Sequence, residues 1–178
     1  CGVGGQQAVQ PLGIDLPPNA QGEIVTRSEC VMKGYYKMPD ATADAIDRYN
    51  WLHTGDLGEM DDNGYFKVTG RIKDMIIRGG ENIYPRELEE FLFTHPKVVN
   101  VQVIGIPDKK YGEQVLAAIQ LKAGQTATPE EFTEFCQGKI ARHKIPKYWE
   151  FVDDYPTTAS GKIQKFKMKE VFEKKYPA

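Results

Sequence analysis

The chain has 178 residues, of which 40% are hydrophobic and 27% are charged. This is the composition of an ordinary globular protein, and the length allows one large domain or two small ones. The net charge of −2 argues against a general nucleic-acid-binding surface, and no apolar run is long enough to span a membrane.

The first third of the chain predicts β structure with one short helix. Residues 22–29 (GEIVTRSE) are a strand candidate after the turn-rich LPPNAQ, and residues 40–49 (DATADAIDRY) predict a short helix. Residues 51–70 predict two strands joined through Asp61-Asp62-Asn63-Gly64. Asn-Gly between two such runs is a strong hairpin signal.

A different pattern follows the segment RIKD at residues 71–74. MIIRGG predicts a short strand that ends in two glycines. YPRELEEFLFTHP predicts a helix with Pro85 in its first turn. The apolar side chains expected on one face of this helix are Leu88, Phe91 and Leu92. VVNVQVIGI and QVLAAIQLKA predict two further strands, and in the first we expect Val99, Val101 and Val103 to share the apolar face.

The clearest predicted helix is TPEEFTEFCQGKIARH, residues 128–143. Thr128 is its expected N-cap, and Glu131 would complete a capping box. The expected buried stripe consists of Phe132, Phe135, Cys136 and Ile140. YWEFV predicts a last strand and PTTASGK a loop. Residues 165–176 predict a basic helix with Val171 and Phe172 facing inward.

Residues 75–178 thus predict the order β-α-β-β-α-β-loop-α, which indicates an α+β domain with an antiparallel sheet flanked by helices. Residues 1–70 are expected to be the end of another, β-rich unit. The first residue is a cysteine and not methionine, and no signal peptide is evident. We therefore expect the chain to be a piece of a longer protein.

The cysteines and histidines are scattered through the sequence. They are Cys1, Cys30, Cys136, His53, His95 and His143. Their spacing fits neither a metal site nor an even disulfide set, so we expect no metal role, and a reducing compartment such as the cytoplasm.

Three places in the first part of the chain and just after it are candidates for chemistry. Asp56, in HTGDLG, could accept two hydrogen bonds from a sugar diol, although a turn-capping aspartate is the simpler interpretation. Arg71 has a fork of donors suited to a diol or a phosphate. Gly79 and Gly80 would let a ligand approach the backbone closely, although an ordinary turn explains them equally well.

A fourth candidate lies near the chain end, in PTTASGKIQK. Ser160 and Gly161 allow a tight turn that would project Lys162, a compact cation suited to a phosphate or carboxylate. The alternative is that Lys162 belongs to a solvated basic face. Taken singly, none of these signals is specific.

Their combination and order resemble the adenylate-forming enzyme superfamily. YNWLHTGDLG is followed by GYFKVTGRIKDMIIRGGENIYPRELEE, IGIPDKKYGE, KIPKYWEFV and YPTTASGKIQK. The chain looks most like the acyl-CoA synthetases of that superfamily, the AMP-forming fatty-acid–CoA ligases, and the resemblance covers nearly everything from Leu16 onward.

The resemblance implies a reaction in two halves. A carboxylic acid attacks ATP to give an acyl-adenylate and pyrophosphate, and the thiol of CoA then displaces AMP. By resemblance, Asp56 and Arg71 hold the ribose hydroxyls, and Lys162 contacts the reacting carboxylate and phosphate. Lys73 matches the hinge about which the C-terminal domain rotates between the two half-reactions.

The resemblance also implies a path for CoA. Gly79, Gly80 and Glu81 match the segment that lines the pantetheine tunnel after rotation. Residues 145–147, with Lys147 at their end, match a stretch near CoA in some members of the family. Mg²⁺ would accompany ATP in the full-length enzyme, but no metal ligand is identified in this chain.

One departure from the family pattern concerns the phosphate-binding loop. The Gly/Ser/Thr-rich loop is absent, and Arg27 and Lys33 cannot replace it. We therefore expect residues 1–72 to be the end of a large AMP-binding N-terminal domain, missing here, and residues 73–178 to be the C-terminal lid domain. An aryl-acid or other adenylating ligase, and a stand-alone nucleotide-binding or interaction module that reuses the lid, stay open as alternatives.

Overall fold

A computed structural model describes residues 6–9 and 16–177 of the chain, with side chains from residue 16 onward. The chain divides into two compact units, Cys1–Lys73 and Asp74–Ala178. Cys1 lies outside the described residues. Among the described residues, no helix is both long and apolar enough to cross a membrane.

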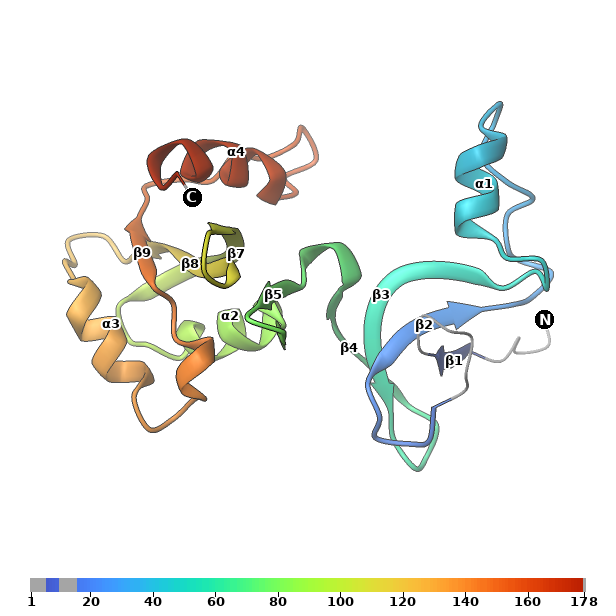
Figure 1. The fold of residues 1–178 in the computed structure, drawn as a ribbon, viewed down its shortest axis with the longest axis horizontal. Coiled ribbons are helices and arrows are strands. Elements are labelled where there is room, and N and C mark those ends of the chain that lie inside the picture. The colour runs from blue at the N-terminus through green and yellow to red at the C-terminus, as the bar shows by residue number, and fades with distance from the viewer. Residues whose placement is uncertain (1–5, 10–15, 178) are drawn as a thin grey trace. The chain divides into compact units, whose positions relative to one another are not determined.

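The first unit is built on an antiparallel sheet in the order β1-β2-β3-β4 (Figure 1). Its strands are β1 (Gln6–Val9), β2 (Gly22–Thr26), β3 (Leu52–Met60) and β4 (Phe66–Arg71). The predicted strand at residues 22–29 is confirmed, but it ends at Thr26. The predicted short helix is α1 (Pro39–Ala45), which stops where Ile46 turns extended.

The turn between β3 and β4 is the hairpin that Asn-Gly predicts. The carboxylate of Asp61 accepts hydrogen bonds from the backbone N–H groups of Asn63 and Tyr65, both at 2.9 Å. Gly64 has a φ of +82°, a conformation that glycine adopts without steric cost. Local turn chemistry therefore fixes the register of the two strands that carry Asp56 and Arg71.

The second unit is an α+β domain, as predicted. It begins at Asp74, the last residue of a short 3₁₀ turn, η1 (Ile72–Asp74). The strands of its sheet are β5 (Ile76–Arg78), β6 (Glu81–Ile83), β7 (Val98–Asp108), β8 (Gly112–Leu121) and β9 (Tyr148–Phe151). Four of them follow the order β6-β5-β8-β7, and β9 pairs with β8.

Two features of this sheet differ from the prediction. Strand β6 was not expected; the two glycines before it reverse the chain, so that Ile83 pairs with Ile76. Strand β9 runs parallel to β8, whereas we expected antiparallel strands throughout. The reason is that helix α3 (Pro129–Cys136) lies between β8 and β9, and such a crossover returns the chain in the same direction.

Helices cover both faces of the sheet. Helix α2 (Pro85–Phe93) and α3 bury their apolar side chains in one core cluster, and α4 (Lys165–Lys175) buries its own in another. Strand β8 supplies Val115, Ala117 and Ile119 to the first cluster, and Leu116 and Ala118 to the second. Because both faces of β8 are buried, its sequence is a continuous apolar run.

Three predicted core positions need correction. Val99 is 46% exposed, because the register shifts between Val98 and Asn100 and buries Val98 in its place. Val171 is 62% exposed, since the buried stripe of α4 follows Met168 and Phe172, one turn apart. Ile140 packs against the core from beyond α3 and not from within it.

At the start of α3, only one of the two hydrogen bonds of the predicted capping box forms. The hydroxyl of Thr128 accepts a hydrogen bond from the backbone N–H of Glu131 at 3.3 Å. The Glu131 carboxylate instead bonds to the ammonium of Lys97 at 2.9 Å. That bond ties α3 to the chain segment that enters β7, which is a tertiary contact in place of a local one.

Candidate functional site

Asp56 and Arg71 form a cross-strand pair in the first unit. Their Cα atoms are register partners in β3 and β4, and the Nε–H of Arg71 donates to Oδ1 of Asp56 at 3.0 Å. The side chains stay 32% and 57% exposed. The structure thus brings together these two predicted site residues, with the second carboxylate oxygen available to another donor.

A buried carboxylate supports the strand bend just before Asp56, and sequence reasoning missed it. Glu23, only 7% exposed, accepts the backbone N–H of Gly55 at 3.0 Å and lies 2.8 Å from Nδ1 of His53. Gly55 has a φ of +71°. Nothing in the strand pattern of residues 22–29 marks Glu23 as an inward-facing charge.

Lys73, the predicted hinge, lies in the 3₁₀ turn η1 at the end of the first unit. Its side chain is exposed and makes no ion pair with any residue that the structure describes. A single 3₁₀ turn contains few hydrogen bonds, so a change of its backbone dihedrals costs little.

Gly79 and Gly80 form the two-residue turn between β5 and β6. Their φ values are +60° and +87°, the signs that a type I′ hairpin turn requires. The N–H of Gly79 donates to the carbonyl of Tyr111 at 2.8 Å, and a Cβ on Gly79 would lie 3.1 Å from the Tyr111 ring. Glu81 follows in β6 and is exposed.

Arg78 precedes this turn and contacts residues that pack beside it, although sequence reasoning did not single it out. Its Nε–H donates to the side chain of buried Gln114 at 2.6 Å, and its guanidinium lies 4.6 Å from the Tyr111 ring centroid. It also donates to the carbonyl of His143 at 3.3 Å. An arginine beside two glycines carries no sequence signal of such a role.

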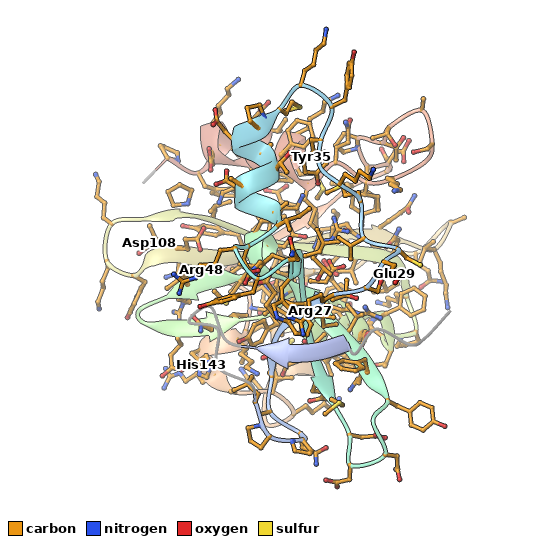
Figure 2. The ribbon with its side chains drawn as sticks, turned by 90° about the vertical axis from the view of Figure 1, so that its right-hand side faces the viewer. Arg27, Glu29, Tyr35, Arg48, Asp108 and His143 are labelled. Atoms are coloured by element: carbon orange, nitrogen blue, oxygen red, sulfur yellow. The ribbon has the colours of Figure 1, made fainter. Side chains whose placement is uncertain are left out.

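Lys147 is joined to the same region through Asp108, the residue labelled in Figure 2. Its ammonium lies 3.1 Å from Oδ2 of Asp108, while Oδ1 accepts the N–H of Tyr111 at 3.0 Å. Hydrogen bonds to Tyr148 and Asp108 raise the pKa of Lys147. The hydrogen bond from Tyr111 and the one from Lys147 hold the pKa of Asp108 below its ordinary value. Lys147 and the glycine turn therefore belong to one connected cluster.

Lys162 projects from a loop that is bonded within itself. The N–H of Thr158 donates to the carbonyl of Lys162 at 2.9 Å, and the N–H of Lys162 donates back to the Thr158 hydroxyl at 3.1 Å. Gly161 turns the chain at a φ of +80°. The Lys162 side chain is exposed and has no ion-pair partner among the described residues.

This lack of an ion pair contrasts with the basic helix that follows. In α4, Lys165 pairs with Glu89 at 2.6 Å, Lys169 with Glu113 at 3.1 Å and Lys175 with Glu150 at 2.7 Å. Three of the five lysines of α4 are thus paired, whereas Lys167 and Lys174 are exposed and have no ion-pair partner among the described residues. No described contact joins Lys162 to the cluster of Gly79 and Lys147.

The described histidines and cysteines show no arrangement for metal binding. No group of three or more His, Cys, Asp or Glu side chains among the described residues could hold a metal ion. His95 is buried against Phe132 and Phe135, and desolvation lowers its pKa. Burial raises the pKa of Cys136 to about 11, whereas Cys30 is exposed.

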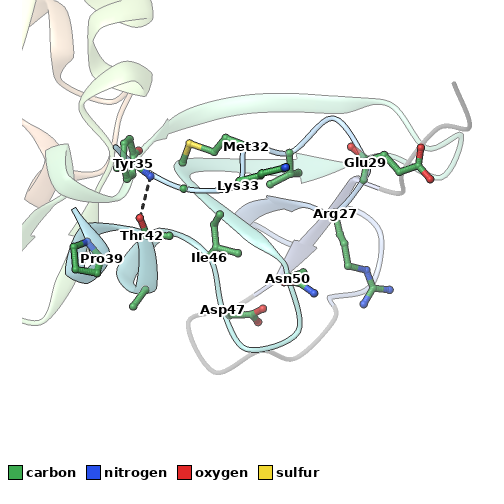
Figure 3. Close-up of a pocket in the computed structure, with 14 residues that line it drawn as sticks. Arg27, Glu29, Met32, Lys33, Tyr35, Pro39, Thr42, Ile46, Asp47 and Asn50 are labelled. Atoms are coloured by element: carbon green, nitrogen blue, oxygen red, sulfur yellow. Dashed lines mark hydrogen bonds between the residues drawn. The ribbon is translucent and has the colours of Figure 1, made fainter. Parts of the chain in front are cut away.

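A cavity of about 870 Å³ opens in the first unit between α1 and the segment that follows β2 (Figure 3). Arg27 and Lys33 lie on its wall together with the apolar Met32 and Ile46. None of the predicted site residues lines it. The guanidinium of Arg27 lies 4.6 Å from the ring centroid of Trp51.

Comparison with known proteins gives a consistent result. Residues 87–162 match the family described as the AMP-binding enzyme C-terminal domain. The chain is 62% identical over 150 residues to YngI of Bacillus subtilis (strain 168), which is named as a candidate acyl-CoA synthetase. It is 54% identical over 156 residues to the human mitochondrial medium-chain acyl-CoA ligase ACSF2.

The alignments cover most of this chain but a small part of each relative. They span 84% of the chain and 27% of the Bacillus protein, and 88% of the chain and 25% of the human one. The crystal structure of ATP-bound MatB from Rhodopseudomonas palustris matches with a TM-score of 0.91 at 35% identity. That match covers 96% of this chain and 34% of MatB.

Proposed function

Because this chain belongs to the AMP-binding, adenylate-forming enzymes and corresponds to their C-terminal portion, we propose that it completes the active site of an AMP-forming acyl-CoA ligase. The complete enzyme, meaning the full-length protein that carries this chain, would join a carboxylic acid to CoA at the expense of ATP. The observation that carries the proposal is Lys162, an exposed cation on a self-bonded loop with no acidic partner among the described residues.

In the first half-reaction a carboxylate oxygen attacks the α-phosphorus of ATP and pyrophosphate leaves. Negative charge is shared between the carboxylate and the phosphate oxygens in the transition state. A lysine ammonium aimed at that charge in a site without water is worth a factor of about 10²–10³ in rate. Lys162 supplies this cation in our proposal.

Asp56 and Arg71 would hold the ribose of the nucleotide. An ionised carboxylate has about four lone-pair sites, so it can accept hydrogen bonds from both hydroxyls of a diol and from a further donor. Here Arg71 fixes Oδ1 of Asp56 at 3.0 Å, which orients the carboxylate and leaves Oδ2 for the ribose. The pair is built before any ligand arrives, so little conformational freedom is lost on binding.

In the second half-reaction the thiol sulfur of CoA bonds to the acyl carbon, and AMP leaves with its phosphate oxygen. The turn at Gly79 and Gly80, followed by Glu81, would line the path of the pantetheine arm, since backbone without side chains allows close approach. Lys147 would add a cation near this path. Its ammonium has three donors, so the bonds to Asp108 and Tyr148 leave one.

Lys73 would be the hinge between the half-reactions, because it lies in the single 3₁₀ turn at the end of the first unit. Mg²⁺ commonly accompanies ATP, but the described residues offer no cluster of carboxylates for it. We therefore assign no step of the reaction to a metal held by this chain. A reducing compartment stays part of the proposal, although the human relative is named as mitochondrial.

The proposal is tested by acid-dependent pyrophosphate release and by thioester formation. The complete enzyme should release pyrophosphate with acids from a panel of fatty and aromatic acids, and CoA should convert the product to a thioester. The 178-residue chain alone should release none, because it has no Gly/Ser/Thr-rich phosphate loop. Pyrophosphate release by the chain alone, or none by the complete enzyme with any acid, would contradict the proposal.

A further inference from the structure

The edge of the sheet in the second unit is closed by an ion pair. Strand β7 is the last strand in the order β6-β5-β8-β7, so alternate backbone groups along it have no neighbouring strand. At Val103, two side chains make the hydrogen bonds that a neighbouring strand would otherwise make. The N–H of Val103 donates to Oε1 of Glu89 at 2.8 Å, and its carbonyl accepts from Nζ of Lys165 at 3.2 Å.

Glu89 and Lys165 also bond to each other, with 2.6 Å between Oε1 and Nζ. Glu89 comes from α2, which packs in the first core cluster, and Lys165 begins α4, which packs in the second. The pair therefore passes around the sheet edge and joins the helices on its two faces. The backbone of Val103 determines which charge lies where: its N–H group requires the carboxylate, and its carbonyl requires the ammonium.

This pair is better shielded from water than the other ion pairs of α4. The side chains of Lys165 and Glu89 are 22% and 19% exposed, whereas Lys169 is 41% and Lys175 is 55% exposed. Exposed ion pairs contribute little to stability. Removing Lys165 from this half-buried pair would leave the Glu89 carboxylate and the Val103 carbonyl without their shared donor, which costs more than the loss of an exposed pair.

The first turn of α4 needs such support, because its own sequence provides none. Gln164, at the N-cap position, makes no side-chain capping bond, and the first turn has no acidic residue. Lys165 and Lys167 instead place positive charge at the positive end of the helix dipole. The Gln164 side-chain oxygen is buried without a partner among the described residues. A tertiary contact must therefore fix where this helix begins.

We infer that Glu89 and Lys165 are positioning residues that hold the Lys162 loop in the orientation that the adenylation half-reaction requires. The inference rests on the function proposed above for Lys162. The loop from Thr157 to Ile163 is closed by hydrogen bonds between its own residues. Its orientation then depends on its attachments, and the Lys165 ammonium is anchored only three residues after Lys162.

The first arm of the test measures hydrogen exchange in the 178-residue chain. Lys165→Met should accelerate exchange in residues 157–164 by roughly tenfold or more, since bonds to charged groups contribute about 1.5–3 kcal/mol. Lys165→Arg can still pair with Glu89 and should restore most of the protection. Lys175→Met removes the pair with Glu150 at the far end of the same helix and should leave the loop unchanged.

The second arm measures both half-reactions in the complete enzyme. Lys165→Met should lower the kcat of pyrophosphate release about tenfold. It should leave the KM for the acid and the rate of thioester formation from supplied acyl-adenylate nearly unchanged. Glu89→Gln keeps an acceptor for the Val103 N–H but loses the charge, and should show the same pattern to a smaller extent. Lys165→Arg should recover most of the activity.

Several outcomes overturn the inference. Unchanged exchange in residues 157–164 in Lys165→Met shows that the pair does not hold the loop. Equal losses in the two half-reactions, or a matching loss in Lys175→Met, show a general effect on folding. If the unmodified enzyme releases no pyrophosphate, the proposed function fails instead, and the exchange measurement still decides whether the pair holds the loop.

Discussion

The glycine turn between β5 and β6 allows a prediction with an internal control. Gly79 and Gly80 both have positive φ, and an L-residue in that conformation costs about 1–2 kcal/mol. Replacing glycine by alanine also restricts the unfolded chain, which offsets about 0.4–1 kcal/mol of that cost. Gly80→Ala should therefore destabilise the second unit by about 1 kcal/mol, because its Cβ would meet nothing within 4 Å.

Gly79→Ala should cost more for a reason visible in the structure. Its Cβ would lie 3.1 Å from the ring of Tyr111, which is held by the guanidinium of Arg78 and by the bond of its N–H to Asp108. Displacing that ring adds about 1 kcal/mol, the usual size of a small overpacking strain. We expect a total near 2 kcal/mol, roughly twice the effect at Gly80.

Urea unfolding followed by tryptophan fluorescence measures this difference. Trp51 and Trp149 are the only tryptophans, so a Trp51→Phe background leaves Trp149, in β9, to report the second unit. In the complete enzyme, Gly79→Ala should slow thioester formation more than pyrophosphate release. Equal destabilisation by the two alanine substitutions would refute the assigned contact with Tyr111, and an effect below about 0.5 kcal/mol at both would refute the left-handed turn.

Three further predictions concern the hinge, the second unit and its buried histidine. In the complete enzyme, Lys73→Pro should preserve pyrophosphate release but block thioester formation, because proline fixes φ and prevents the rotation; wild-type rates in both assays would mean that Lys73 is not the hinge. Residues 75–178 should fold without residues 1–70, on the core that includes Leu88, Val103 and Phe132, and stronger hydrogen-exchange protection before Arg71 than after it would contradict this. Burial lowers the pKa of His95 below its ordinary 6.5, so the unfolded state binds more protons as the pH falls through that value and stability is lost there. His95→Gln should reduce the fall in the free energy of unfolding, measured by urea titration, between about pH 7 and pH 5. An unchanged pH dependence would contradict the role assigned to His95.

Local sequence signals predicted the elements of the fold well, because each rests on chemistry within a few residues. Asn63-Gly64 predicted the β3–β4 hairpin, and Thr128 predicted the start of α3. Two predictions failed for different reasons. Val99 faces outward because the register shifts beside β8, a strand distant in the sequence. Strand β6 was missed although it pairs with β5 across the local turn at Gly79 and Gly80.

The candidate site shows the same division. Asp56 and Arg71 are recognisable from their motifs, and the structure adds that they are register partners in neighbouring strands. The supporting residues carry no such signal. Glu23, Arg78 and Glu89 act through contacts with residues that lie 30 or more, 36 and 76 positions away. A charged residue next to a strand or on a helix is ordinarily solvated, so only the fold shows that these three are not.

The central claim is that Lys162 delivers the cation for adenylation, and one measurement tests it most directly. Lys162→Ala in the complete enzyme should lower acid-dependent pyrophosphate release by about 10²–10³, and should leave thioester formation from supplied acyl-adenylate nearly unchanged. Lys167→Ala, at an exposed lysine of α4 without an ion pair among the described residues, is the matched control and should leave both rates unchanged. Equal losses in the two half-reactions of Lys162→Ala would contradict the account.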